Sequence, residues 1–310
     1  MHVSPAADRV SRRRMHAQDR VAKRSRLHVI AAVPVWLPLS LFALVVWAVQ
    51  RLLSKVALQD LGTRKFYLLS AIVSLLTYAP YLVLQPPAKS ELLPAFGLAC
   101  LMAVTFGVTT EAIRRGPLGT VSPITALSPA LTAALAILIL HERIGPPAYL
   151  GVALAPAGIV LLNLGRQKGE GQTGWRALAL ASLVLQGVGA FVAKLVVTPA
   201  GPSALLLMSA AVQVVVGLFL APPSRWHHQD LLRRPAVFTI VAYMTAGIAT
   251  IGYLGALASG PASVVVPLVA TSPALAGLAG IVVLHERTSN QQLVGITLAL
   301  AGAVLLAAQA

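Results

Sequence analysis

The chain is short of charge, of acidic residues and of cysteine. Only 11% of its 310 residues are charged, and Asp and Glu together number 9. The single cysteine, Cys100, excludes an intrachain disulfide and leaves thiol-based metal binding or redox chemistry without a second cysteine. The adjacent His227 and His228 have no further metal ligands near them in the sequence. We therefore expect neither a metal ion nor any other cofactor.

Apolar residues take the place of the missing charge. They make up 57% of the chain, and the mean hydropathy is +0.80, far above the range of soluble domains. A helix crosses the hydrocarbon core of a bilayer with about 20 apolar residues. Ten segments satisfy this requirement, at residues 33–57, 66–84, 92–113, 118–140, 147–164, 175–197, 203–221, 235–257, 262–284 and 291–308. The sequence therefore predicts an all-α integral membrane protein with ten transmembrane helices.

The first 32 residues differ from the rest because they are polar and basic. Eight of the 24 Lys and Arg residues lie between Arg9 and Arg26, so much of the +15 net charge belongs to this tail. No nucleic-acid-binding motif follows it, and we expect the tail to be disordered and to contact anionic lipid headgroups rather than nucleic acid.

The membrane part contains an internal repeat. Residues 116–162 align with residues 260–306 without a gap, and close to half of the positions are identical. A shared Leu-His-Glu-Arg sequence and shared prolines are not effects of membrane composition, so duplication explains the match. We expect two five-helix units, at residues 33–164 and 175–308. Because five is an odd number of crossings, the second unit enters the membrane from the opposite side and the two form an inverted repeat.

These residues carry a family resemblance. Each repeat has a small-residue helix with Ser-Pro-Ala-Leu that ends in His-Glu-Arg, and a glycine-bearing helix follows it; Trp47 also precedes Lys55 by eight residues. In this pattern the chain resembles the ten-helix EamA-type members of the drug/metabolite transporter superfamily. The second repeat departs from it, since Gln186 stands at the Trp position before Lys194. The resemblance implies a transporter with helices one to four and six to nine around a central cavity and helices five and ten outside.

Paired prolines predict where a substrate crosses. Proline removes a helical hydrogen bond, and matched Pro-interrupted helices near the midplane indicate the binding site of a transporter. The helix-break residues are Pro123, Pro129, Pro267 and Pro273. Ser128 and Ser272 precede two of them and are candidate substrate ligands. The alternative, that these small residues only allow close helix packing, stays open.

Polar residues inside apolar segments are the other candidate substrate ligands. Lys55 and Lys194 occupy equivalent places in the first and sixth segments, with Gln50 and Gln186 in the same segments and Arg51 one turn before Lys55. Such lysines either line a cavity or extend to the lipid headgroups. We add Tyr253 as a candidate lining residue, with membrane anchoring as its alternative.

Three acids are candidates for proton coupling or gating. Glu111 lies inside a predicted span but is followed by Arg114 and Arg115 at ion-pair spacing. Glu142 and Glu286 end equivalent helices of the two repeats. We expect an interfacial ion pair at Glu111, with proton coupling as its alternative, and structural or gate contacts at Glu142 and Glu286.

These features favour a secondary transporter that exports a small neutral, zwitterionic or anionic metabolite, such as an amino acid, by alternating access. No phosphate-binding Gly-rich loop and no catalytic constellation is present in the sequence, so we expect no enzyme. The alternatives are a lipid-headgroup flippase or an accessory membrane subunit of the same fold. Protons are the candidate coupling ion, and a homodimer is an open alternative to a monomer.

Orientation is the point on which the charges conflict. The basic tail places both termini in the cytoplasm and the protein in the inner or plasma membrane. The loops on the side opposite the tail, however, hold most of the remaining Lys and Arg residues. We expect cytoplasmic termini, because the tail charges are clustered and precede the first helix.

Overall fold

A computed structural model describes residues 33–61, 63–116, 118–163, 173–220, 234–284 and 289–308. Within these ranges, the side chains of residues 52, 54–61, 63–66, 118–120, 200, 234–236, 283 and 284 are not described. The chain divides at Pro34, and the compact unit from Val35 onward holds every described helix. The basic tail predicted for residues 1–32 lies outside the described residues.

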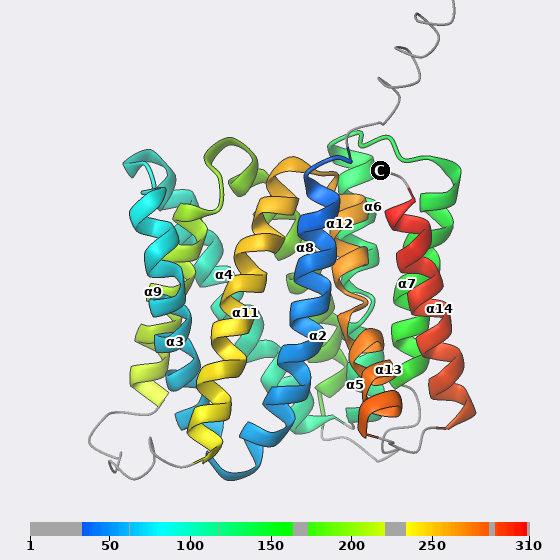
Figure 1. The fold of residues 1–310 in the computed structure, drawn as a ribbon, viewed down its shortest axis with the longest axis horizontal. Helices are drawn as coiled ribbons and strands as arrows, with labels where there is room; N and C mark the ends of the chain where they lie inside the picture. The colour runs from blue at the N-terminus through cyan, green and yellow to red at the C-terminus, as the bar shows by residue number, and fades with distance from the viewer. Residues whose placement is uncertain are drawn as a thin grey trace, which may run out of the picture. The chain divides into compact units, whose positions relative to one another are not determined.

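Regular structure in the described residues is entirely helical (Figure 1). The first repeat contains α2 (Trp36–Leu61), α3 (Thr63–Leu84), α4 (Lys89–Arg115), α5 (Leu118–Thr125), α6 (Ser128–Ile139) and α7 (Pro146–Asn163). The second contains α8 (Trp175–Ala200), α9 (Ser203–Leu220), α11 (Arg234–Ser259), α12 (Ala262–Val269), α13 (Ser272–Leu284) and α14 (Asn290–Ala307). The predicted all-α membrane fold is confirmed.

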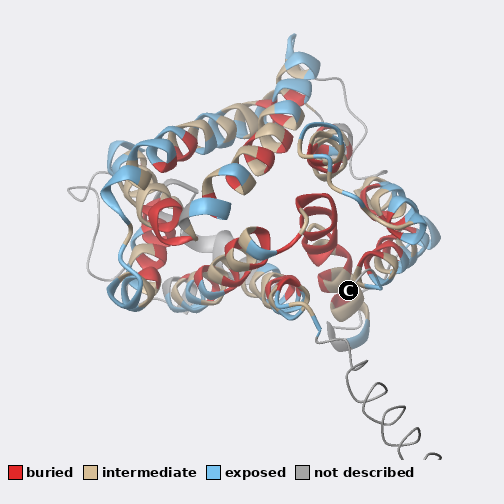
Figure 2. Ribbon diagram, turned by 90° about the horizontal axis from the view of Figure 1, so that it is seen from above, coloured by how far each residue is buried: buried red, intermediate tan, exposed pale blue. Residues whose placement is uncertain are grey.

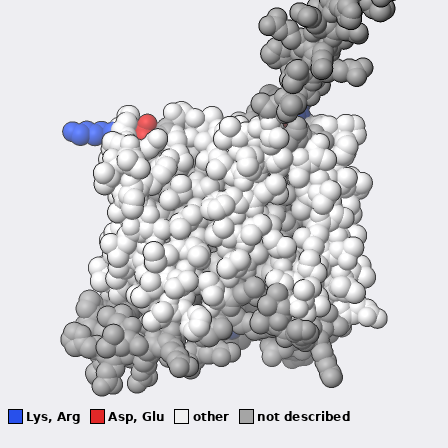
Figure 3. Space-filling model, in the orientation of Figure 1, with Lys and Arg blue, Asp and Glu red and all other residues white. Residues whose placement is uncertain are grey.

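The helices match the dimensions of a bilayer. In the described part of the chain, 9 helical stretches are long and apolar enough to cross a membrane. For α2 the described apolar stretch is Trp36–Arg51, since the side chains of residues 52 and 54–61 are not described. Large apolar side chains such as Phe219 are exposed, and Figure 3 shows a bundle face whose charged atoms lie only near its ends. Lipid contact explains both observations.

Two equivalent helices are broken in the middle. One separates into α5 and α6 at Ala126 and Leu127, and the other into α12 and α13 at Ala270 and Thr271. Proline explains the breaks: Pro129 is the second residue of α6 and Pro273 the second of α13, and neither can donate a helical hydrogen bond to the preceding turn. Short i→i+3 bonds replace the regular ladder, such as Leu127 N to Ile124 O at 3.2 Å and Thr271 N to Leu268 O at 3.2 Å.

Helix pairs from different repeats form the bundle. α2 packs against α11, α4 against α8 and α9, and α3 against α9. Figure 2, which looks along the helices, shows that exposed residues gather on the outer faces of the peripheral helices. All eight residues of α12 are buried, which places this half-helix in the core.

Glycines bring α7 and α14 into backbone contact. A Cβ atom added to Gly158 would lie 2.3 Å from the Ala299 nitrogen, and one added to Gly295 would lie 2.5 Å from the Leu162 nitrogen. Small residues allow such close approach between membrane helices, where dispersion contacts drive association. The two terminal helices of the repeats therefore form a tightly packed pair (Figure 1).

Candidate functional site

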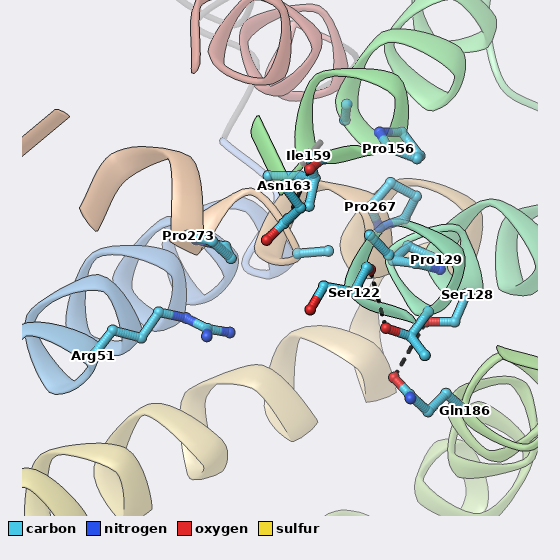
Figure 4. A pocket seen from close by; sticks show the side chains of 14 residues that line it. Arg51, Ser122, Ser128, Pro129, Pro156, Ile159, Asn163, Gln186, Pro267 and Pro273 are labelled. Atoms are coloured by element: carbon cyan, nitrogen blue, oxygen red, sulfur yellow. Dashed lines mark hydrogen bonds between the residues drawn. The ribbon is translucent and has the colours of Figure 1, made fainter. Parts of the chain in front are cut away.

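A cavity of about 390 Å³ lies beside the two helix breaks (Figure 4). Its volume is in the range of small-molecule sites. Its lining comes from α2, α5, α6, α7, α8, α12, α13 and the two breaks: Arg51, Ser122, Thr125, Ala126, Ser128, Pro129, Ala155, Pro156, Ile159, Asn163, Gln186, Pro267, Ala270 and Pro273. Residues of both repeats thus meet at one site.

Gln186 organises the polar wall of this cavity. Its amide oxygen accepts a hydrogen bond from the Ser128 hydroxyl at 3.5 Å, and its amide nitrogen donates to the Ser182 hydroxyl at 2.8 Å and the Thr109 hydroxyl at 3.3 Å. The hydroxyl groups of Thr109 and Ser182 lie 2.6 Å apart. Because both ends of the amide are bound, its orientation is set before any ligand arrives.

Arg51 supplies the charge of the cavity. Among the described lining residues it alone is charged, and its guanidinium extends from α2 into the space between Ser122 and Pro273 (Figure 4). No hydrogen bond or ion pair joins it to another described side chain. The alignment of Trp47 with Gln186 places Ala190 at the equivalent position of the second repeat. In the described lining the charge therefore comes from the first repeat.

Lys194 lies in a different part of the bundle. Its amino group donates to the carbonyl oxygens of Leu257 at 2.8 Å and Gly260 at 2.7 Å, which ties α8 to the end of α11. Trp36 of α2 covers Gly260, where an added Cβ atom would lie 2.4 Å from the indole Cγ. Gln186 precedes Lys194 by eight residues, or about 12 Å along α8. The lysine thus lies beyond the cavity, toward the end of the bundle where α2 begins.

Glu142 holds the same end from the first repeat. Its carboxylate accepts hydrogen bonds from the backbone nitrogens of Ala262 at 2.9 Å and Ser263 at 2.8 Å, and from the Ser263 hydroxyl at 2.5 Å. These groups form the N-terminus of α12, which favours a negative charge. His141, with φ 52° in the left-handed region, makes the turn that leads from α6 to Glu142. We call the cluster of Trp36, Glu142, Lys194, Gly260 and Ser263 the Lys194 end.

Several predicted site residues meet at the cavity and others do not. The cavity lining includes Ser128, Gln186, Pro129, Pro267 and Pro273. The remaining described candidates lie elsewhere. Ser272 and Pro123 are buried, and Gln50 is half-buried. Tyr253 packs against Trp47 with ring centroids 5.2 Å apart, and Lys194 and Glu142 belong to the Lys194 end. The Lys55 side chain and Glu286 lie outside the described residues.

Glu111 forms an ion pair on the surface of α4. Its carboxylate contacts Arg114 at 2.5 Å and Arg115 at 2.6 Å, and all three side chains are substantially accessible. Glu111 does not line the cavity among the described residues. The predicted ion pair is thus present, whereas its place at the membrane interface stays a prediction.

Sequence reasoning named Arg51 only as a neighbour of Lys55, and it missed Ser122 and Asn163. A signal existed for Arg51, because a charge inside an apolar span is a site candidate by default. The cavity wall also differs from the arrangement that the family resemblance implied. The fifth membrane helix, α7, contributes Ala155, Pro156, Ile159 and Asn163, and it contacts both halves of the first broken helix, α5 and α6.

Comparisons with known proteins agree with this fold. A family model described as the EamA-like transporter family matches residues 34–164 and 173–308. A solved structure described only as "Crystal structure of protein" superposes with a TM-score of 0.69 at 17% sequence identity, and the match covers 87% of this chain and 95% of that chain. At this identity the likeness shows the fold alone. No curated protein matches the chain.

Proposed function

The chain belongs to the EamA-like transporter family, and we propose that it is a secondary transporter that exports a small metabolite by alternating access. The metabolite is neutral, zwitterionic or anionic, for example an amino acid. The observation that carries this proposal is the cavity at two matched helix breaks, with Gln186 and Ser128 on its wall. Discontinuous helices that face each other across a repeat interface are the usual place for a transporter's substrate site.

The difference between the two ends of the bundle supports alternating access. At the Lys194 end α8 packs against α11. The equivalent helices of the first repeat are α2 for α8 and α4 for α11, and these two make no comparable contact in the described structure. An inverted repeat allows the two halves to exchange these arrangements, so that the cavity opens to one side of the membrane and then to the other. We propose that residues 33–164 and 175–308 are these inverted units.

Membrane placement belongs to the same proposal. The chain is a multi-pass membrane protein, and we place it in the inner or plasma membrane with both termini in the cytoplasm, as the basic tail indicates. In this orientation the Lys194 end is cytoplasmic. The tail contacts anionic lipids, protons are the coupling ion to be tested, and a homodimer is the oligomer to be tested.

Transport by purified protein in liposomes tests the proposal. Labelled amino acids, organic acids and neutral metabolites are loaded inside, and their exit is followed with and without a pH gradient. We expect saturable exit of at least one of these compounds and a loss of rate of about tenfold in Gln186→Leu, because its amide is a preorganised ligand. Val104→Leu, at an exposed apolar position on α4, is the matched control.

Two outcomes would contradict the proposal. Movement of quaternary ammonium compounds without any amino or organic acid would refute the substrate class. Movement of a labelled phospholipid between leaflets without any free metabolite would instead identify a flippase of the same fold.

A further inference from the structure

We infer that Arg51 is the anion-binding group of the cavity and that the ligand carries one carboxylate, phosphate or sulfonate group. A hydrogen-bonding part of the same ligand then reaches Gln186. This inference rests on the proposed function, because it names the chemistry of the transported molecule. It goes beyond that proposal by excluding purely neutral molecules and by assigning the charge to one side chain.

Arg51 is the one charged residue in the described lining of the cavity. The described lining contains Arg51, polar hydroxyls and amides, prolines and small apolar residues, but no carboxylate. An arginine remains protonated in every protein environment, so the described lining keeps one positive charge. A cationic ligand would bring a second positive charge into a low-dielectric site without compensation, which is strongly unfavourable.

Lys194 does not add a second cation to the described lining of the cavity. Sequence reasoning placed two lysines beside the substrate, but the amino group of Lys194 is bound to two backbone carbonyl oxygens at the Lys194 end. The second repeat also has Ala190 at the position equivalent to Arg51. A ligand with a single anionic group therefore matches the described lining better than one with several.

The direction of the Arg51 side chain argues against an interfacial role. An arginine that only extends to the lipid headgroups turns away from the bundle. Arg51 instead points toward Ser122 and Pro273, and Gln186 lies on the far side of the same space (Figure 4). The guanidinium fork suits two-point binding of an oxyanion. The Gln186 amide oxygen, which accepts one hydrogen bond from Ser128, can accept a second one from the other end of the ligand.

Melting of the purified protein in detergent tests the inference with pairs of compounds. Each pair is a carboxylate and its amide on the same carbon skeleton, and a soluble phosphate ester and a short-chain lipid phosphate form further arms. We expect carboxylates or phosphates, but not the amides, to raise the melting temperature. In Arg51→Gln the apparent affinity for these anions falls by about ten- to hundred-fold, and Arg51→Lys retains part of it.

Arg176→Gln is the matched control. Arg176 lies at the start of α8 against the Trp175 ring, with 5.6 Å from its guanidinium carbon to the ring centroid, and it does not line the cavity. The substitution removes one positive charge, as Arg51→Gln does, but leaves the cavity lining unchanged. Anion binding is therefore expected to be unchanged. If both variants weaken binding equally, the effect is the general surface potential and the inference is overturned.

The remaining outcomes separate this inference from the proposed function. Amides that bind as well as their carboxylates, or the absence of stabilisation by every anion tested, would overturn the role of Arg51. If liposomes still export metabolite in that case, the transport function stands alone. Arg51-dependent anion binding without any flux supports the site and refutes transport. Stabilisation by the lipid phosphate and not by the soluble ester assigns the same site to a lipid headgroup.

Discussion

The two ends of the bundle are held by different chemistry. At the Lys194 end an ammonium group binds two backbone carbonyl oxygens and a carboxylate binds the N-terminus of α12. Toward the other end the described lining residues Arg51 and Asn163 remain beside the cavity. When helices part, water can take over such hydrogen bonds, because water donates to a carboxylate and accepts from an ammonium group. We therefore propose that the Lys194 end is a gate that is closed in this structure.

The tightly packed pair of α7 and α14 has the opposite character. Its contact is made by backbone atoms across Gly158, Gly295 and Gly302, and no water can replace such packing when the helices separate. We therefore expect the Lys194 end to open during transport and the α7 and α14 pair to stay together.

Removal of the Glu142 carboxylate gives the largest expected effect. Glu142→Ala deletes three hydrogen bonds to a charged acceptor, which favours opening of the Lys194 end by about 3–5 kcal/mol. A cysteine at Val266, on the buried half-helix α12, reports this opening by maleimide labelling in a Cys100→Ser background. Glu142→Gln, which keeps an acceptor oxygen, should label at an intermediate rate. Equal labelling of all three proteins would show that this end is not a gate.

Crowding of the α7 and α14 pair should change stability rather than gating. Gly158→Ala places a methyl group against the Ala299 backbone, and such overpacking costs about 1–3 kcal/mol. We expect a lower melting temperature with the Val266 labelling rate per folded molecule unchanged. Gly107→Ala on α4 meets no atom within 4 Å and is the control. A gating change in Gly158→Ala would mean that the pair moves with the gate.

Replacement of Lys194 should open the same end by a smaller amount. Lys194→Met removes two hydrogen bonds to neutral carbonyl oxygens while the aliphatic stem is kept, with an expected effect of about 1.5–2 kcal/mol. The Val266 labelling rate measures it. Lys194→Arg keeps the donors and serves as the matched control. If transport selectivity changes and labelling does not, Lys194 belongs to the substrate path and the comparison of the two ends must be revised.

Neutralisation of Glu111 gives the smallest expected effect. Its partners Arg114 and Arg115 lie on the accessible surface of α4, and exposed ion pairs contribute little. Glu111→Gln should change the rate of proton-driven flux by less than about twofold. Loss of the response to a pH gradient in this variant, at normal surface expression, would instead make Glu111 the coupling residue.

The Lys194 end and the cavity differ in how much of their structure could be predicted from the sequence. Leu-His-Glu-Arg in both repeats pointed to Glu142, since a charge at a matched helix end is visible without coordinates. The backbone groups that Glu142 binds lie about 120 residues away in the chain, which no local pattern reveals. For Lys194 and Arg51 the local evidence was alike, a cation inside an apolar helix, but only one of them lines the cavity.

The sequence by itself determined the all-helical membrane fold, the ten apolar segments, the internal repeat and the neighbourhood of the two helix breaks. These are local properties: the length of an apolar run sets a span, and proline withholds a hydrogen bond wherever it stands. Only the tertiary structure decided that Arg51 and Gln186 share a cavity, that Lys194 binds carbonyl oxygens beyond it, and that α7 joins the wall. The rotation of each helix about its axis decides these contacts, and in a nearly uniform apolar sequence that rotation follows from packing against helices distant in the chain.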